Sequence, residues 1–136
     1  MNLHYNQNYS KEESDAVLDK IKSCVSSNRY TIALNENRQE NINFINEYNI
    51  RRDKQKNILL QLKTEDFCYT VQNRKIGYEQ EILYVFVPQV HLFNNDDIDE
   101  MVDVYTKFNI ITQGNGKRTV VISFHRLNKP IEYLFR

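Results

Sequence analysis

The sequence has no tryptophan and is poor in glycine, proline and cysteine, with three, two and two of them among 136 residues. Few turns can therefore rely on glycine or proline. Cys24 and Cys68 lie far apart, with no CxxC pair and no nearby histidine cluster, which argues against a disulfide framework or a zinc site. Cys24 falls on the apolar side of a helical pattern, so we expect it to be a small buried hydrophobe.

Long apolar runs are also missing, and none approaches the ~18 residues of a membrane span. Residues 1–20 are polar and lack the apolar stretch of a signal peptide. We therefore expect a cytoplasmic protein with no membrane partner. The length and the 40% hydrophobic content are typical of one globular domain. We predict a single domain over residues 1–136, in which residues 1–9 form a flexible arm because they show no periodicity.

Neither sign of charge is in excess, since 18 Lys and Arg balance 18 Asp and Glu. The two signs are nevertheless distributed unevenly. Residues 1–103 carry twelve basic and seventeen acidic side chains, whereas residues 104–136 carry six basic side chains against Glu132 alone. Such asymmetry indicates a surface for a polyanion at the C-terminal end. An ordinary solvated hairpin is the alternative explanation.

Helical periodicity dominates the first half of the chain. Ser10 and Glu13 have the spacing of a capping box, and the apolar residues that follow predict a helix to about Ser26. Its expected inward residues are Ala16, Val17, Ile21, Cys24 and Val25. A short strand is predicted over residues 29–34. The next helical stripe, within residues 35–49, consists of Ile42, Ile45 and Tyr48, with Phe44 beside it.

A third helix is predicted from Asp53, which can cap a helix start, to Leu62. Its expected inward residues are Ile58, Leu59 and Leu62. The basic run at residues 51–56 places positive charge at the start of this helix, where it is unfavourable to the helix macrodipole. The run is either a solvated helix face or a contact surface for phosphates or an acidic partner.

The hydrophobic period changes to that of strands in the second half. Residues 82–87 are too apolar for a surface strand, so we predict a central strand that ends at Pro88, which has no amide donor. The acidic segment 94–99 is predicted to be a turn. Its carboxylates could bind a divalent cation, but the segment lacks the central glycine of a calcium loop, and we predict a solvated turn and no metal. The pattern favours an α+β fold, with N-terminal helices packed on a small antiparallel sheet that ends in a β-hairpin.

The terminal hairpin has the clearest pattern in the sequence. Residues 101–111 and 118–126 both alternate, and the glycine-containing segment 113–117 between them is the best turn signal. The predicted inward residues are Val102, Val104, Thr106, Phe108 and Ile110 on the first strand and Val120, Ile122 and Phe124 on the second. The predicted outward residues are Asp103, Tyr105, Lys107 and Asn109, then Val121, Ser123 and His125.

A three-residue loop, Gly114 to Gly116, fixes the register of the two strands. The inward pairs are then Phe108 with Ile122 and Ile110 with Val120. The outward pairs are Tyr105 with His125 and Lys107 with Ser123. Directly opposed residues have Cβ atoms ~4.5–5.5 Å apart. We therefore expect a phenol, an ammonium, a hydroxyl and an imidazole to gather on a solvent-facing side of the hairpin.

These groups suit metal-free RNA cleavage, which needs a base, an acid and cations that stabilise the charged phosphate. His125 is the natural acid or base, because histidine titrates near neutral pH. Lys107 can offset the charge of the transition state, and Tyr105 can donate to a phosphate oxygen or stack on a base. The expected RNA-binding residues are Lys117, Arg118, Arg126 and Ser123, although strict alternation points Arg126 to the other face. The alternative is a group of ordinary surface residues.

Several short motifs follow one another in the last two-thirds of the chain. They are Asp66-Phe67, Val104-Tyr105-Thr106-Lys107, and Val121-Ile122-Ser123-Phe124-His125, followed by Pro130, Tyr133 and Phe135. In this order they resemble the MqsR-type (motility quorum-sensing regulator) toxins of the RelE-like mRNA interferase superfamily. The likeness runs from about Asn49 to the C-terminus, so residues 49–136 are the expected toxin-like core.

The resemblance implies a compact antiparallel sheet packed on N-terminal helices. It also implies the toxin of a type II toxin–antitoxin system, an endoribonuclease that cleaves mRNA without a metal or other cofactor and is neutralised by a cognate antitoxin protein. The active-site tyrosine and lysine of the VYxK strand and the residue that closes the final strand correspond here to Tyr105, Lys107 and His125. We expect no binding to DNA by the protein alone.

A second class of function stays open beside this one. A protein on the same RelE-like scaffold can bind without catalysis, as an inhibitor or adaptor from a phage or mobile element. Its acidic first two-thirds would then engage a basic partner protein.

Overall fold

The computed structural model describes residues 5–35, 38–114 and 116–136. Within these residues the chain has three α-helices and seven β-strands, which confirms the α+β class. The helices are α1 (Lys11–Ser26), α2 (Gln39–Glu47) and α3 (Arg52–Leu60). The strands are β1 (Tyr5–Asn6), β2 (Tyr30–Ile32), β3 (Phe67–Gln72), β4 (Ile82–Phe86), β5 (Gln89–Phe93), β6 (Asp99–Gln113) and β7 (Gly116–Arg126).

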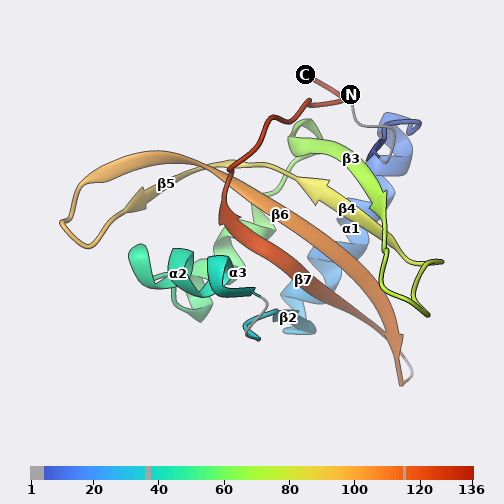
Figure 1. The fold of residues 1–136 in the computed structure, drawn as a ribbon, viewed down its shortest axis with the longest axis horizontal. Helices are drawn as coiled ribbons and strands as arrows, with labels where there is room; N and C mark the ends of the chain where they lie inside the picture. Colours follow the sequence, from blue (N-terminus) through green and yellow to red (C-terminus); the bar gives the residue numbers. More distant parts are fainter. Residues whose placement is uncertain (1–4, 36–37, 115) are drawn as a thin grey trace.

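The described strands form one seven-stranded sheet, which is larger than the small sheet predicted from the sequence. Its order is β1-β3-β4-β6-β7-β2, and β5 pairs with the first part of β6 (Figure 1). Neighbouring strands are antiparallel except β2, which runs parallel to β7. Because β1 and β2 alternate with the helices along the chain, the helices do not form a separate N-terminal block. β4 lies between β3 and β6, as predicted for a central strand, and Pro88 follows its end.

Helix α1 begins where the sequence predicts. The Ser10 hydroxyl accepts a hydrogen bond from the Glu13 amide (3.1 Å), and the Glu13 carboxylate accepts one from the Ser10 amide (2.8 Å). These bonds satisfy two amides that have no partner within the helix. The buried apolar residues of α1 are Leu18, Ile21, Cys24 and Val25. Ala16 is exposed, contrary to the prediction, because the buried stripe follows positions 14, 18, 21 and 25.

The other two helices confirm the predicted stripes in part. In α3, Ile58 and Leu59 are buried, as is Leu62 just beyond the helix end. The predicted cap at Asp53 is wrong, because α3 begins one residue earlier and the Asp53 carboxylate accepts the amide of the next residue. The buried side of α2 is rotated from the prediction: Asn41, Phe44 and Tyr48 are buried, and Ile42 and Ile45 are half-buried.

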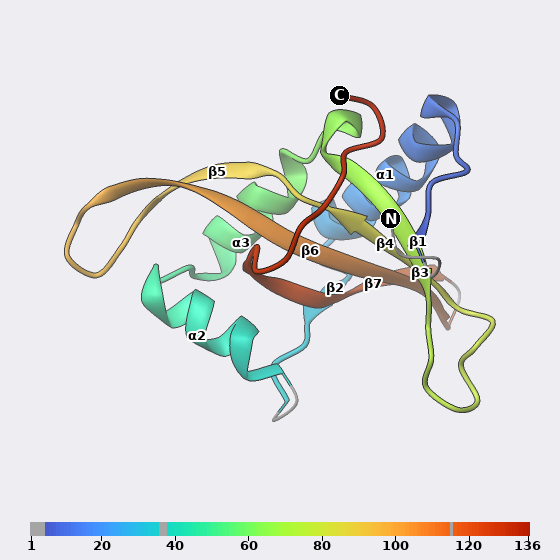
Figure 2. The same ribbon diagram turned by 45° about the horizontal axis from the view of Figure 1, so that its top comes forward.

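Each face of the sheet carries its own hydrophobic cluster. All three helices contribute to the cluster on one face, which contains Ile21, Phe44, Leu59 and Phe108. The cluster on the opposite face consists of Cys68, Tyr69, Val85, Val87 and Tyr105. The C-terminal segment, residues 127–136, packs against this second cluster through Leu127, Ile131 and Tyr133. Figure 2 shows the segment crossing in front of β6, so the face that carries Tyr105 is partly covered.

Residues 5–9 are not the flexible arm predicted from their lack of periodicity. β1 pairs with β3, and the Gln7 side-chain amide donates to the carbonyls of Cys68 (2.9 Å) and Glu132 (3.2 Å). These bonds tie the sheet edge to the C-terminal segment. Residues 1–4, which belong to the same prediction, lie outside the described residues. In the described part of the chain, none of the helices combines the length and the apolar character that a membrane span requires.

Candidate functional site

The register of the terminal hairpin matches the prediction at its open end and departs from it toward the turn. The pairs Tyr105–His125 and Lys107–Ser123 are confirmed. Beyond Lys107 the register shifts by one residue, and the observed pairs are Phe108–Val121 and Ile110–Thr119. The predicted pairs Phe108–Ile122 and Ile110–Val120 are therefore wrong. Pairing also reaches Gln113 and Gly116, so the predicted three-residue loop is too long; Asn115 lies outside the described residues.

A β-bulge at Ile122 causes the shift, since this residue has no partner in either register. The bulge brings Val121 into the core in place of Ile122. The buried side chain of Asn41 forms hydrogen bonds with backbone groups at the bulge. Its amide nitrogen donates to the carbonyls of Ala33 (2.9 Å) and Ile122 (3.0 Å), and its oxygen accepts from the amide of Phe124 (2.9 Å). One side chain of α2 therefore stabilises the bend that re-aims β7.

Tyr105 and His125 are neighbours, but neither is open to solvent. Their ring centroids lie 5.3 Å apart, with the planes inclined by 25°. Tyr105 is 3% exposed because the C-terminal segment packs over it, and the His125 side chain is 12% exposed. The Nδ1 atom of His125 lies 2.8 Å from the carbonyl oxygen of Arg126 and 3.7 Å from the Glu40 carboxylate. The prediction of a solvent-facing cluster is thus wrong for this pair.

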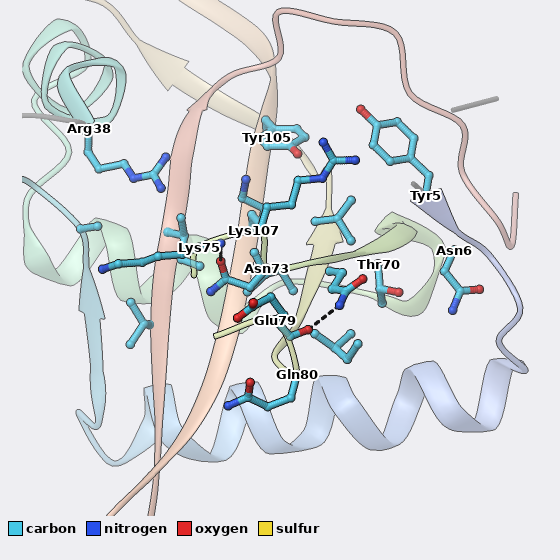
Figure 3. A pocket seen from close by; sticks show the side chains of 18 of the residues that line it. Tyr5, Asn6, Arg38, Thr70, Asn73, Lys75, Glu79, Gln80, Tyr105 and Lys107 are labelled. Carbon is cyan, nitrogen blue, oxygen red and sulfur yellow. Dashed lines mark hydrogen bonds between the residues drawn. The ribbon is translucent and has the colours of Figure 1, made fainter. Parts of the chain in front are cut away.

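A groove of about 1180 Å³ lies on the same face of the sheet (Figure 3). Strands β1, β3, β4, β6 and β7 line it, together with the segment after β2 and the loop between β3 and β4. Tyr105 and Lys107 belong to the lining, whereas Ser123 and His125 do not. The charged residues of the described lining are the cations Arg38, Arg74, Lys75, Lys107 and Lys129 and one carboxylate, Glu79.

Two of the groove cations lie close enough to Lys107 to change its pKa. Burial, with the added repulsion of Arg38 and Lys129, lowers the pKa of Lys107 to about 8. An anion that enters the groove would relieve this repulsion and favour the charged form of Lys107. The Lys129 ammonium lies 4.6 Å from the centroid of the Tyr105 ring, a cation–π distance. The arrangement favours a negatively charged, flexible ligand along the sheet.

The other predicted RNA-binding residues lie outside the groove lining. Arg118 donates to the hydroxyl of Thr31 (2.6 Å), which fixes it on β2. Arg126 forms ion pairs with carboxylates of α2 (3.4 Å) and β6 (3.5 Å), on the face that strict alternation indicates. Ser123 is buried, and Lys117 is exposed beside the turn. The cations of the groove are therefore largely different from those that the sequence singled out.

Four of the groove cations were missed by the sequence analysis: Arg38, Arg74, Lys75 and Lys129. Arg74 and Lys75 form an adjacent basic pair ahead of Gly77, in the connection from β3 to β4. This pair was a readable signal, but its position beside the hairpin depends on β3, a strand that the sequence did not predict. Lys129 counted in the charge asymmetry and was not assigned to a site.

No group of three or more His, Cys, Asp and Glu side chains in the described ranges lies close enough together to hold a metal ion. Comparison of the chain with protein-family models, with curated proteins and with solved structures finds no match in any of the three.

Proposed function

We propose that this protein is a cytoplasmic toxin of a toxin–antitoxin system, with a RelE-like scaffold, that binds mRNA in the groove and cleaves it without a metal ion. The observation that carries the proposal is the charge of the groove. Its described lining has five cations and one carboxylate, in a chain with zero net charge. Cations concentrated along one channel attract the phosphate backbone of a single strand. Lys107 and Tyr105, the VYxK residues, lie in that lining.

The proposed reaction is an intramolecular transesterification. The ribose 2′-oxygen attacks the adjacent phosphorus while its proton passes to a base, and the bond from phosphorus to the 5′-oxygen breaks. An acid protonates the departing oxygen, which leaves a 2′,3′-cyclic phosphate and a 5′-hydroxyl end. Lys107 stabilises the charge on the phosphate oxygens, and Tyr105 donates to them. His125, which the sequence suggests as the acid or base, does not line the groove, so neither proton transfer is assigned to it.

Incubation with defined single-stranded RNA in EDTA tests this proposal. The wild-type protein should produce 2′,3′-cyclic phosphate ends. Lys107→Met should slow cleavage about 100-fold, and Tyr105→Phe, which removes one hydroxyl from a buried ring, about tenfold or more. Lys117→Gln is the matched control, because it removes an exposed cation outside the groove lining. RNA that stays intact with the wild-type protein across varied sequences would contradict the proposal.

A non-catalytic binding protein is the second candidate, and the β5–β6 hairpin favours it. This hairpin extends well beyond the helices (Figure 1). Its exposed apolar residues are Phe93 (62%), Ile98 (56%) and Met101 (59%), and Asp96, Asp97 and Asp99 lie among them. An apolar tip with acidic neighbours suits a basic partner protein, as in an inhibitor or adaptor from a phage or mobile element.

Induction of the chain in cells separates the two candidates. The toxin proposal predicts growth arrest and loss of transcripts with the wild-type chain, relief by Lys107→Met, and neutralisation by an antitoxin protein. The binding proposal predicts intact RNA and no effect of Lys107→Met. It predicts instead that Phe93→Ser and Met101→Ser abolish the cellular effect, since they remove the exposed apolar surface.

A further inference from the structure

Three arginines, Arg29, Arg52 and Arg118, gather at the edge of the sheet and form what we call the arginine cluster. β2 is the last strand in the order of the described sheet. The carbonyl oxygen of Tyr30 in β2 accepts hydrogen bonds from Arg118 of β7 (3.2 Å) and from Arg52 of α3 (3.4 Å). The guanidinium groups of these two arginines therefore meet at a single oxygen atom.

A second contact fixes the direction of each of these two side chains. Arg118 also donates to the hydroxyl of Thr31 (2.6 Å). The guanidinium carbon of Arg52 lies 3.8 Å from the centroid of the Tyr30 ring, a cation–π distance. Both guanidinium groups are thus held in place by the protein itself, before any ligand is bound.

The third arginine reaches the cluster from the residue that precedes β2. The carbonyl of Arg29 accepts a hydrogen bond from the amide of Thr119 in β7 (3.1 Å), so the backbone of Arg29 lies beside this strand. Its guanidinium packs against Gly116, so closely that a β-carbon at Gly116 would overlap with it. Arg29 is therefore directed along the start of β7, the part of the strand that carries Arg118.

Carboxylates do not balance the charge of the arginine cluster in the described structure. None of the ion pairs among the described residues includes Arg29, Arg52 or Arg118. Asp53 adjoins Arg52 in the sequence, but its carboxylate accepts the amide of Lys54. Like charges that are held together repel, and an anion that bridges them relieves the repulsion. The planar fork of N–H groups in arginine matches the oxygens of a phosphate.

The cluster lies next to the groove, on the path of a strand that leaves the groove over β7. Val120 lines the groove and is two residues from Arg118, and the pairing of β7 is regular between them, so both side chains lie on the same face. Thr31, the partner of Val120 in β2, carries the hydroxyl that Arg118 binds. Ala33, just after β2, again lines the groove. An RNA strand in the groove can thus reach the cluster across β7 and β2.

We propose that Arg29, Arg52 and Arg118 form a second phosphate site, which binds a backbone phosphodiester of the RNA strand where it leaves the groove. This inference rests on the proposed RNA-binding function of the groove and extends it. The substrate class is then single-stranded RNA long enough to span both the groove and the edge of β2. A bound phosphate also offsets the unfavourable position of Arg52 at the start of a helix.

A length series of uncleavable 2′-O-methyl strands, from about 4 to 16 nucleotides of one repeated base, tests this site by fluorescence anisotropy. The wild type and Arg52→Gln should bind the shortest strands equally, because these strands occupy the groove alone. Equal binding of the shortest strands also shows that the variant is folded. The longest strands should bind the wild type about tenfold tighter than Arg52→Gln, because only they reach the arginine cluster.

Two further variants sharpen the comparison. Arg29→Gln should show the same dependence on strand length as Arg52→Gln, because both arginines belong to the cluster. Arg51→Gln is the matched control, since Arg51 is exposed, adjoins Arg52 and carries the same charge. It should leave the affinity for every strand within about twofold of the wild type, because a solvent-exposed charge outside the cluster is screened by salt.

The outcomes separate this site from the proposed function. Equal affinities of the wild type and Arg52→Gln for the longest strands overturn the second phosphate site and leave RNA binding in the groove standing. Equal losses in Arg51→Gln and Arg52→Gln indicate attraction by diffuse charge and also overturn the site. Absence of binding by every strand overturns RNA binding by the groove, and the second site with it.

Discussion

Lys107 is the residue at which the electrostatics of the groove act most strongly. It is partly buried on β6 and faces the positive charges of Arg38 and Lys129, which together with burial lower its pKa to about 8. No carboxylate is among the causes of this shift. The folded protein therefore holds this ammonium at a cost in stability that an anionic ligand would remove.

Replacement of Lys107 by methionine should raise the free energy of unfolding by about 1 to 2 kcal/mol at pH 7. Because the pKa falls from 10.5 to about 8 on folding, the unfolded chain binds more protons between these pH values. The stability of the wild type then rises with pH over this window, and the advantage of Lys107→Met shrinks from pH 8 to 10.5. Denaturant titrations across the window measure this difference.

The control for this experiment is Lys117→Met, at an exposed position beside the hairpin turn. It should change the free energy of unfolding by less than about 0.5 kcal/mol at each pH. A Lys107→Met protein that is less stable than the wild type at pH 7 would show that Lys107 is not held among repelling charges.

At the scale of elements, the bulge in β7 depends on a side chain from α2. Asn41 is buried and makes three hydrogen bonds, to the backbone of Ala33, Ile122 and Phe124. It joins α2, β7 and the residue after β2 at the point where the hairpin changes register. The positions of Tyr105 and Lys107 opposite β7 therefore depend on a residue more than sixty positions earlier in the chain.

Replacement of Asn41 by alanine should lower the free energy of unfolding by about 2 to 4 kcal/mol, because it leaves a buried amide and two partly buried carbonyls without this partner. Chemical denaturation measures the change. Asn43→Ala on the same helix is the matched control, because Asn43 is exposed and bonds only within α2. Equal stabilities of the two variants would mean that Asn41 does not secure the bulge.

The sequence predicted those parts of the fold that local patterns determine. Alternation in the two terminal strands was sufficient to pair Tyr105 with His125, and the capping box located the start of α1. The bulge at Ile122 was not predictable from alternation, because its backbone is satisfied by Asn41 of a distant helix. Strand β3 escaped prediction because its first four residues are buried on both faces and show no alternation.

The candidate site was predicted less completely than the fold. Tyr105 and Lys107 were identified and line the groove, but the sequence did not indicate that the C-terminal segment would cover Tyr105 or that His125 would be largely buried. Arg74 and Lys75 were not identified either, because the position of a loop residue relative to the hairpin depends on how the strands on both sides of the loop pair in the sheet. Contacts between distant parts of the chain decide such positions, and local pattern carries no information on them.

At the scale of the whole molecule, zero net charge conceals a strong separation of charge. The acidic tip of the β5–β6 hairpin and the basic groove are distinct surfaces of one chain. The basic segment 104–136 indicated by the sequence contributes two of the five groove cations, Lys107 and Lys129. Its arginines have other partners. Arg118 donates to Thr31 of β2, Arg126 forms an ion pair with Glu47 of α2, and Arg136 forms an ion pair with Asp66. The cations of the groove thus come from several distant parts of the chain, and not from one basic segment.

The salt dependence of RNA affinity tests the central claim that this groove binds the RNA backbone. With an uncleavable 2′-O-methyl strand, the logarithm of the affinity should fall against the logarithm of salt concentration with a slope of roughly −3.5 for five contacted phosphates. The double variant Arg74→Gln, Lys75→Gln should reduce the steepness by about 1.4, and Lys117→Gln should leave it unchanged. An affinity insensitive to salt, or the same slope in the groove variant as in the wild type, would contradict the account.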